Sequence, residues 1–320
     1  MIVSGYSIDM VRNISGYRYP DKLSVEEKRE LRDNIISGIA ALNLPLKYIP
    51  SYLANQTEID YMQEENLLSM NVSNGADPSL LIDEKTGLVI TINDNDHMLI
   101  STVSKKSWDE CYNQVTMIDK SLNNIFDIQR DRTFGYLSAS TPLSGYGMIY
   151  DSMIHLPALM NKNKVMNSVE KIMKRPGGLL IPYNNMTRPS AFFVLRLIVK
   201  QDPKEDLEFA KNLSEEMSIM EEAEVEYLKH DEDFVSYIEN RVKNYIKDGK
   251  VQFADFLRVL DDVSLYAKVS GVNINGSDIA NVLISTQPEH LNRQSIDEKD
   301  VEKFYFDRIM SLLPEKLRSI

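Results

Sequence analysis

The chain has 320 residues, of which 43% are apolar and 26% are charged, and its formal net charge is −12 at pH 7. This length is sufficient for two domains, and the composition is typical of a globular protein. The negative charge argues against binding to nucleic acids or anionic membranes, because both require clustered lysines and arginines.

Cysteines and histidines are too few and too scattered to form a disulfide or a metal centre. Cys111 is the single cysteine, and the four histidines show neither HxxxH nor HExxH spacing. The sequence contains no run of 18 apolar residues, and its first residues do not resemble a signal peptide. We therefore expect a cytoplasmic protein without a bound metal.

The first 79 residues are expected to form a small helical entry to the fold. Residues 24–43 begin with Ser24 and Glu27, which have the spacing of a capping box, and continue with helical periodicity. A second helix is predicted at 57–71, after a stretch that is interrupted by prolines.

Residues 80–229 combine strand and helix patterns, and we expect them to form an α+β core. β-Rich runs predict strands at 88–94, 97–104, 135–140, 177–185 and 191–201. Apolar residues at helical spacing predict helices at 107–126, 148–174 and 203–229, the second of which is entered or interrupted near Pro157.

The last part of the chain, residues 230–320, has an almost wholly helical pattern with glycines at the expected helix ends. The predicted fold class is therefore α+β. A first domain at 1–229 contains an antiparallel sheet flanked by helices, and a helical C-terminal domain follows at 230–320.

Several segments resemble motifs of the guanidino-phosphotransferases (phosphagen kinases). "INDNDHMLI" at 92–100 resembles the family's asparagine–glutamate–glutamate–aspartate–histidine motif, and "GYLSASTPLSGYGMIYDSMIHLPAL" at 135–159 is similar to its glycine-rich strand and HLPAL run. "IVSGYSIDMVRN" stands where the family has serines and arginines. The tail, "LISTQPEHL" and "SIDEKDVEKFYFDRI", narrows the resemblance to the bacterial protein arginine kinase (McsB) branch.

The resemblance implies a guanidino-kinase-like core and Mg·ATP-dependent transfer of a phosphoryl group to a guanidinium, which in this branch is an arginine side chain. Such transfer works by positioning and by cations that neutralise the phosphates, and in this family those cations are arginines. The matching positions here, where cofactor binding is therefore expected to be lost, are Ser7, Asp9, Leu99, Ile149 and Pro182.

The positions that match the family's catalytic residues are also changed. Ser140 stands for the reactive cysteine, while Asp94 and Asn95 stand for the two glutamates. The family's glutamate loop matches "NNMTRPSA" at 184–191, which contains no glutamate. Asp94 is a remnant acid or a turn residue, and His97 either still stacks on a base or is a hydrogen-bonded core histidine. We expect no catalytic residue and neither ATP nor magnesium as a cofactor.

Two functions remain open from the sequence. The first is a catalytically inactive pseudokinase that acts as a binding or regulatory module. ATP carries a charge of about −4, and without the family's arginines its phosphates would lack cationic partners. Each charge pair that loses a partner costs about 2–5 kcal/mol of binding free energy. The alternative is an active phosphotransferase with relocated site residues, for which the candidates are Asp94, Arg130, Arg132 and Arg188. A purely structural subunit is a third possibility.

The tail carries a separate candidate site. In the protein arginine kinase branch, a helix with an arginine–aspartate–two residues–arginine pattern binds phosphoarginine, and here the matching residues are Lys299, Asp300 and Lys303. Spacing of four residues would place both lysines on one helix face. The resemblance also implies protein partners: a homodimer, or pairing with an active arginine kinase, its zinc-binding activator or a Clp-type protease.

Overall fold

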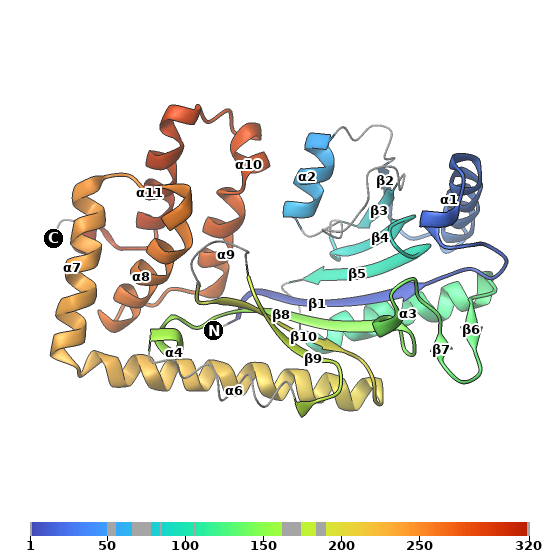
Figure 1. Cartoon of the computed structure of the whole chain (residues 1–320), viewed down its shortest axis with the longest axis horizontal. Helices are drawn as coiled ribbons and strands as arrows, with labels where there is room; N and C mark the ends of the chain where they lie inside the picture. The colour runs from blue at the N-terminus through green and yellow to red at the C-terminus, as the bar shows by residue number, and fades with distance from the viewer. Residues whose placement is uncertain are drawn as a thin grey trace.

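An eight-stranded antiparallel sheet and a group of C-terminal helices are joined by one long helix in the computed structural model (Figure 1). The structure describes residues 2–49, 56–65, 78–83, 85–104, 107–161, 174–183 and 190–318. The strand order across the sheet is β2-β3-β4-β5-β1-β8-β10-β9. The predicted α+β class with an antiparallel sheet is confirmed.

The strands have the following bounds: β1 (Ile2–Arg12), β2 (Lys47–Ile49), β3 (Ser79–Asp83), β4 (Leu88–Ile92), β5 (Met98–Ser104), β8 (Met148–His155), β9 (Gly178–Pro182) and β10 (Phe192–Ile198). A separate two-stranded hairpin consists of β6 (Arg130–Asp131) and β7 (Gly135–Tyr136).

The helices have the following bounds: α1 (Val25–Ala40), α2 (Gln56–Glu64), α3 (Trp108–Ile125), α4 (Pro157–Asn161), α6 (Pro203–Lys229), α7 (Glu232–Asp248), α8 (Phe256–Val269), α9 (Gly276–Ser285), α10 (Pro288–Arg293), α11 (Val301–Met310) and α12 (Glu315–Arg318). Short 3₁₀ turns are η1 (Pro20–Lys22), η3 (Thr141–Leu143), η4 (Phe253–Asp255) and η5 (Glu298–Asp300).

The N-terminal segment corrects one expectation. Residues 2–12, expected to belong to a helical entry, form β1, which lies in the middle of the sheet between β5 and β8. Ile8 and Met10 are buried while Ser7 and Asp9 are partly exposed, so the apolar residues alternate with polar ones. This period of two is the signature of a strand with one buried face.

A second expectation was also wrong. Residues 148–155, assigned from the sequence to a long helix at 148–174, form β8, and the described helix after it is α4 at 157–161. The side chains of β8 alternate between buried and partly exposed, which is again strand periodicity. Residues 162–173 lie outside the described part of the chain.

One face of the sheet is covered by helices. The side chains of Ile8, Ile100 and Tyr150 on this face share a buried apolar cluster with residues of α1, α3 and α6. Both α1 and α3 begin with a complete capping box, at Ser24–Glu27 and Ser107–Glu110, which satisfies amide groups at each helix start. The opposite face carries the residues that the sequence singled out.

The C-terminal helices α7 to α11 pack around α8, whose residues are mostly buried. Phe192 of β10 and Ala158 of α4 belong to the same cluster, so the helices are packed against one end of the sheet. The predicted domain boundary at residue 229 coincides with the last residue of α6, which runs beneath both parts in Figure 1. Within the described ranges, no helix is long and apolar enough to cross a membrane.

Candidate functional site

Four positions that the resemblance assigned to lost arginines lie on the uncovered face of the sheet. Asp9 of β1 faces Ile149 of β8 across the strands, and Ser7 lies two residues away on the same strand. Leu99 of β5 pairs with Val11, which lies on the same side of β1 as Asp9. The strand register therefore brings Ser7, Asp9, Leu99 and Ile149 together, and we call this surface the site face.

The fifth position is not brought to that surface. Pro182 ends β9, at the edge of the sheet, and pairs with Phe193 of β10. Phe193 packs into a cluster with Leu195 and residues of α6, on the covered side. Pro182 is thus separated from the other four positions both by face and by strand.

Among the described residues, the site face carries one guanidinium, which the sequence analysis missed. Arg196 of β10 pairs with Asp151 of β8 and donates from Nε to both carboxylate oxygens at 2.9 and 3.1 Å and from Nη2 to Oδ2 at 2.5 Å. Among the described residues of β5, β1, β8 and β10 that point to this side, Arg196 is the only arginine or lysine. The bidentate pairing raises the pKa of Arg196, so the guanidinium stays charged. Its positive charge is balanced by the carboxylate of Asp151.

Asp9 adds a second carboxylate beside this pair. Its Oδ1 accepts a hydrogen bond from the Ser7 hydroxyl at 3.0 Å, and Ser101 on β5 supplies another. Burial, reinforced by the charge of Asp151, raises the pKa of Asp9 to about 6. The carboxyl is therefore partly protonated near neutral pH, although both serines favour the charged form.

Asp94 follows β4 in the turn between two strands and is buried, whereas Asn95 is exposed. Burial raises the pKa of Asp94 to about 6, and the charges of Asp96 and Asp9 act in the same direction. Since Asp9 interacts electrostatically with both Asp94 and Asp151, the three carboxylates belong to one electrostatic group. This group has the sign that repels a phosphate.

His97 and Asp96 are structural in this arrangement. The ring of His97 is fully buried; its Nδ1 accepts from the amide of Ile14 at 2.9 Å, and its Nε2 lies 2.8 Å from the carbonyl oxygen of Arg18. Burial lowers the pKa of His97, which keeps the ring neutral. Asp96 accepts hydrogen bonds from Asn13, Ser138 and the amide of residue 139, so it connects the end of β1 to the segment after β7.

The glycine-rich segment at 135–147 owes its glycines to close backbone contacts. Gly147 has a φ of 63°, and a Cβ there would lie 2.9 Å from both Nη1 of Arg12 and the carbonyl oxygen of Val11. Arg12 is buried and pairs with Asp119 at 2.6 Å, so it belongs to the scaffold. Ser140 is partly exposed, and its amide donates to Ser138 at 3.1 Å.

The cations proposed as replacements lie elsewhere. Arg130 and Arg132 belong to the exposed β6–β7 hairpin, which projects beyond the sheet in Figure 1, and the Arg130 guanidinium lies 5.1 Å from the ring centroid of Tyr136. Arg188 lies outside the described residues. Arg196 had a signal in the sequence, since it is the one charged residue in "FFVLRLI", but only the register shows that it faces Asp151.

The tail candidates are exposed. Lys299 lies in the 3₁₀ turn η5 and contacts Asp297 at 3.5 Å, Asp300 is the residue before α11, and Lys303 is in the first turn of α11. Lys299 therefore lies in a 3₁₀ turn that leads directly into α11, and not in the same α-helix as Lys303.

A pocket of about 230 Å³ lies between α9 and α11, in the same module. Arg308 lines it and is held by a hydrogen bond from its Nε to the hydroxyl of Ser285 at 3.0 Å. No carboxylate in the described part of the chain forms an ion pair with Arg308. Asp278 and the amides of Asn273 and Asn281 complete the polar lining, so the pocket offers both a cation and an anion.

Comparisons with known proteins agree with this geometry. A family model described as the C-terminal catalytic domain of ATP:guanido phosphotransferases matches residues 29–178. A protein-arginine kinase of Clostridium kluyveri is 27% identical over 169 residues, 51% of this chain and 49% of that protein, so this match spans about half the length of the relative. A protein-arginine kinase of Clostridium novyi is 24% identical over 310 residues, which cover 92% of this chain and 89% of that protein.

Solved structures show the same fold. Lombricine kinase superimposes with a TM-score of 0.57 at 17% identity, covering 69% of this chain and 66% of that one. The substrate-free duplicated taurocyamine kinase of Schistosoma mansoni superimposes with a TM-score of 0.57 at 12% identity, and the match covers 86% of this chain and 48% of that one. Together with the domain match over residues 29–178 and the protein-arginine kinase relatives, these findings show that the chain is similar to the ATP:guanido phosphotransferases.

Proposed function

We propose that this chain is a catalytically inactive relative of the protein-arginine kinases that acts as a binding or regulatory module. The observation that supports this most is the charge of the site face. Where the family has arginines, this face holds Asp9 and uncharged residues, and its one guanidinium, Arg196, is already paired with Asp151.

The residues present do not fit the phosphates of a nucleotide. A triphosphate would face the carboxylates of Asp9, Asp94 and Asp151, and it could recruit Arg196 only by breaking the pair with Asp151. A single arginine that stabilises a phosphoryl transition state contributes roughly 10³–10⁵ in rate. We therefore assign no catalytic step to this face.

Calorimetric titration with Mg·ATP tests the proposal. We expect no binding at millimolar nucleotide and no phosphoarginine on an arginine-rich test protein, as read by mass spectrometry. The protein-arginine kinase of Clostridium novyi is the positive control. Micromolar affinity together with phosphoarginine formation would support the alternative, an active phosphotransferase with rebuilt site residues, and in that case Arg196→Ala should abolish both signals.

Recognition of phosphoarginine in the C-terminal module is a second candidate function, favoured by the guanidinium of Arg308, which lines the pocket and forms no ion pair with a described carboxylate. A phosphoryl group there would meet Arg308, and a guanidinium would meet Asp278. Binding of phosphoarginine, with arginine and inorganic phosphate as comparisons, should be lost in Arg308→Ala and kept in Lys247→Ala, an exposed lysine on α7. A matching loss in Lys299→Ala/Lys303→Ala would instead place the ligand on the exposed tail.

The proposed partners are proteins in the cytoplasm: a second copy of this chain, an active arginine kinase, its zinc-binding activator or a Clp-type protease. Sedimentation of the pure chain, alone and with each partner, separates these possibilities. A chain that stays monomeric and binds none of them would remove the regulatory part of the proposal.

A further inference from the structure

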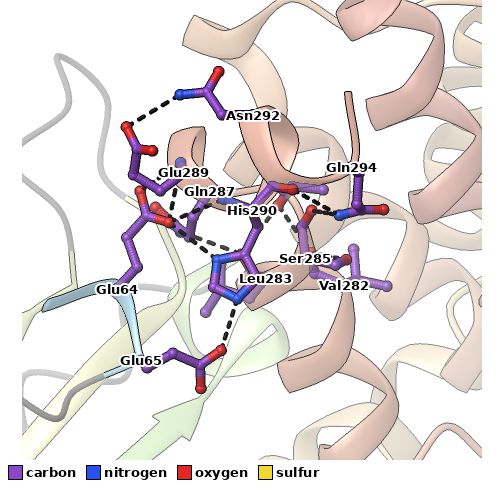
Figure 2. Close-up of polar contacts among 11 residues, drawn as sticks. Glu64, Glu65, Val282, Leu283, Ser285, Gln287, Glu289, His290, Asn292 and Gln294 are labelled. Atoms are coloured by element: carbon purple, nitrogen blue, oxygen red, sulfur yellow. Dashed lines mark hydrogen bonds and ion pairs between the residues drawn. The ribbon is translucent and has the colours of Figure 1, made fainter. Parts of the chain in front are cut away.

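Helix α2 and helix α10 meet through an unusual histidine contact. Nδ1 of His290 lies 3.0 Å from Oε2 of Glu64, and Nε2 lies 2.7 Å from Oε1 of Glu65 (Figure 2). The imidazole ring is thus held between two carboxylates that come from a segment more than 220 residues earlier in the chain. The contact is well shielded, because the side chains of His290 and Glu64 are each 14% exposed.

If both carboxylates are ionised, both contacts can be hydrogen bonds only when the ring carries two protons. An ionised carboxylate only accepts, whereas a neutral imidazole has a single N–H and an acceptor nitrogen on its other side. With neutral His290, one ring nitrogen would therefore face a carboxylate oxygen without a proton between them. The imidazolium form makes two charge-assisted hydrogen bonds in the same geometry.

Charged groups from both helices surround the contact. Glu58, Glu64 and Glu65 lie on the α2 side, and Glu289 and the permanent cation Arg293 belong to α10. Arg293 pairs with Glu58 at 2.5 Å and lies 3.6 Å from the ring centroid of Tyr61, which itself lies 4.8 Å from the His290 ring. Tyr183 and Tyr305 are the other titratable groups near Glu64.

The contact connects the two halves of the molecule. Helix α2 precedes β3 of the sheet, while α10 belongs to the C-terminal helices, and the two lie opposite each other in Figure 1. Glu64 also accepts from the amides of Glu289 and His290 at 3.0 and 3.3 Å. Its carboxylate is therefore attached to α10 through both main chain and side chain.

We propose that His290 is a proton-operated latch that holds the C-terminal helices against α2. In mild acid the imidazolium connects Glu64 to Glu65 and the latch is closed. When the ring loses a proton, one carboxylate faces a bare nitrogen in a half-buried acidic setting, and α10 separates from α2.

The protonation state is tested by ¹⁵N NMR of the full chain labelled at histidine. At pH 6 we expect both ring nitrogens of His290 to carry protons, with the signal changing at alkaline pH. His230 is the control, because its side chain is 80% exposed and contacts only Glu226 on its own helix. A His290 ring with one protonated nitrogen at pH 6 would overturn the proposal.

The movement is tested by electron–electron resonance between spin labels at Thr57→Cys and Lys299→Cys, two exposed positions on either side of the contact. We expect a short distance at pH 6 and a longer or broader one at pH 8.5. His290→Gln should give the long distance at both pH values, whereas His230→Gln should behave as the parent. Identical distributions at both pH values in the parent would refute the latch.

A second variant separates the latch from a general loss of structure. The side-chain amide of Glu65→Gln can donate to the unprotonated Nε2 of a neutral ring, while Nδ1 still donates to Glu64. This variant should therefore keep the short distance at pH 8.5. Opening at pH 8.5 in Glu65→Gln, as in the parent, would contradict the assigned role of the proton.

Discussion

At the scale of single residues, the site face holds Asp9 and uncharged residues at the positions where the resemblance implies arginines. The sequence identified the changed positions Ser7, Asp9, Leu99 and Ile149 through resemblance, and the strand register confirms that they share one surface. The sequence could not identify the pair Asp151–Arg196, because 36 residues separate β8 from β10. The register in which the two strands pair cannot be predicted across such a long connection.

Asp9→Asn should stabilise the protein in alkaline solution. The folded-state pKa of about 6 lies above the ordinary value of 3.8, so folding binds a proton, and the ionised carboxylate costs stability as pH rises from about 4 to above 6. We expect a gain of about 1–2 kcal/mol at pH 8 and almost none at pH 4, measured by urea unfolding. Asp131→Asn should act oppositely, because hydrogen bonds from the amides of Phe134 and Thr133 lower the pKa of Asp131. A gain for Asp9→Asn that is equal at both pH values would contradict the assigned charge effect.

Gly147→Ala should be more harmful than Gly16→Ala. Both glycines have positive φ, 63° and 88°, so both substitutions carry a conformational cost of about 1 kcal/mol. Only at Gly147 would the added Cβ also meet backbone, the carbonyl oxygen of Val11 at 2.9 Å. We expect a further loss of about 1–3 kcal/mol for Gly147→Ala in thermal unfolding. Equal losses in the two variants would show that the close contact relaxes without cost.

At the scale of elements, the helices with strong local signals were predicted well and several strands, among them β1 and β8, were not. Helices α1, α3 and α6 have capping residues and regular apolar spacing that the sequence displays directly. In strands β1 and β8, the spacing of the apolar residues over a short window is compatible with both helical and strand periodicity. Their burial between neighbouring strands, which decides their structure, comes from long-range pairing that local patterns do not report.

Ser107→Ala should destabilise α3 through its capping box. The Ser107 hydroxyl accepts from the amide of Glu110 at 3.3 Å, and the Glu110 carboxylate accepts from the amide of Ser107 at 2.8 Å. We expect a loss of about 1 kcal/mol in chemical unfolding. Ser121→Ala, within the same helix, removes only a bond to the carbonyl of Met117 at 3.1 Å and should change stability by less than about 0.5 kcal/mol. A loss for Ser121→Ala as large as that for Ser107→Ala would exclude the cap as the cause.

At the scale of the whole molecule, the sheet and the C-terminal helices are joined by buried charges as well as by apolar packing. Glu221 of α6 is 1% exposed and accepts from the amides of Ala158 and Leu159 at 3.1 and 3.0 Å. Lys268 of α8 lies 3.3 Å from the same carboxylate. Nothing in the local sequence distinguishes Glu221 from the acidic residues around it on α6, so only the fold reveals this role.

Glu221→Ala should therefore loosen the joint between the two parts. The substitution leaves two buried amides and one buried ammonium without their acceptor, which costs about 3–5 kcal/mol. The neighbouring Glu222→Ala, at an exposed position of the same helix, should change stability by less than about 0.5 kcal/mol. Thermal unfolding of both variants measures the difference, and similar melting temperatures would disprove the role of Glu221.

The central place of β1 has a consequence for biosynthesis. Strand β1 is synthesised before both of its partners: it must pair with β5 on one side and with β8 on the other, and β8 is completed only at His155. Until then a largely apolar strand has no partner on at least one edge, and such exposed edges promote aggregation. Nascent chains of this protein should therefore depend on chaperones until β8 has been synthesised.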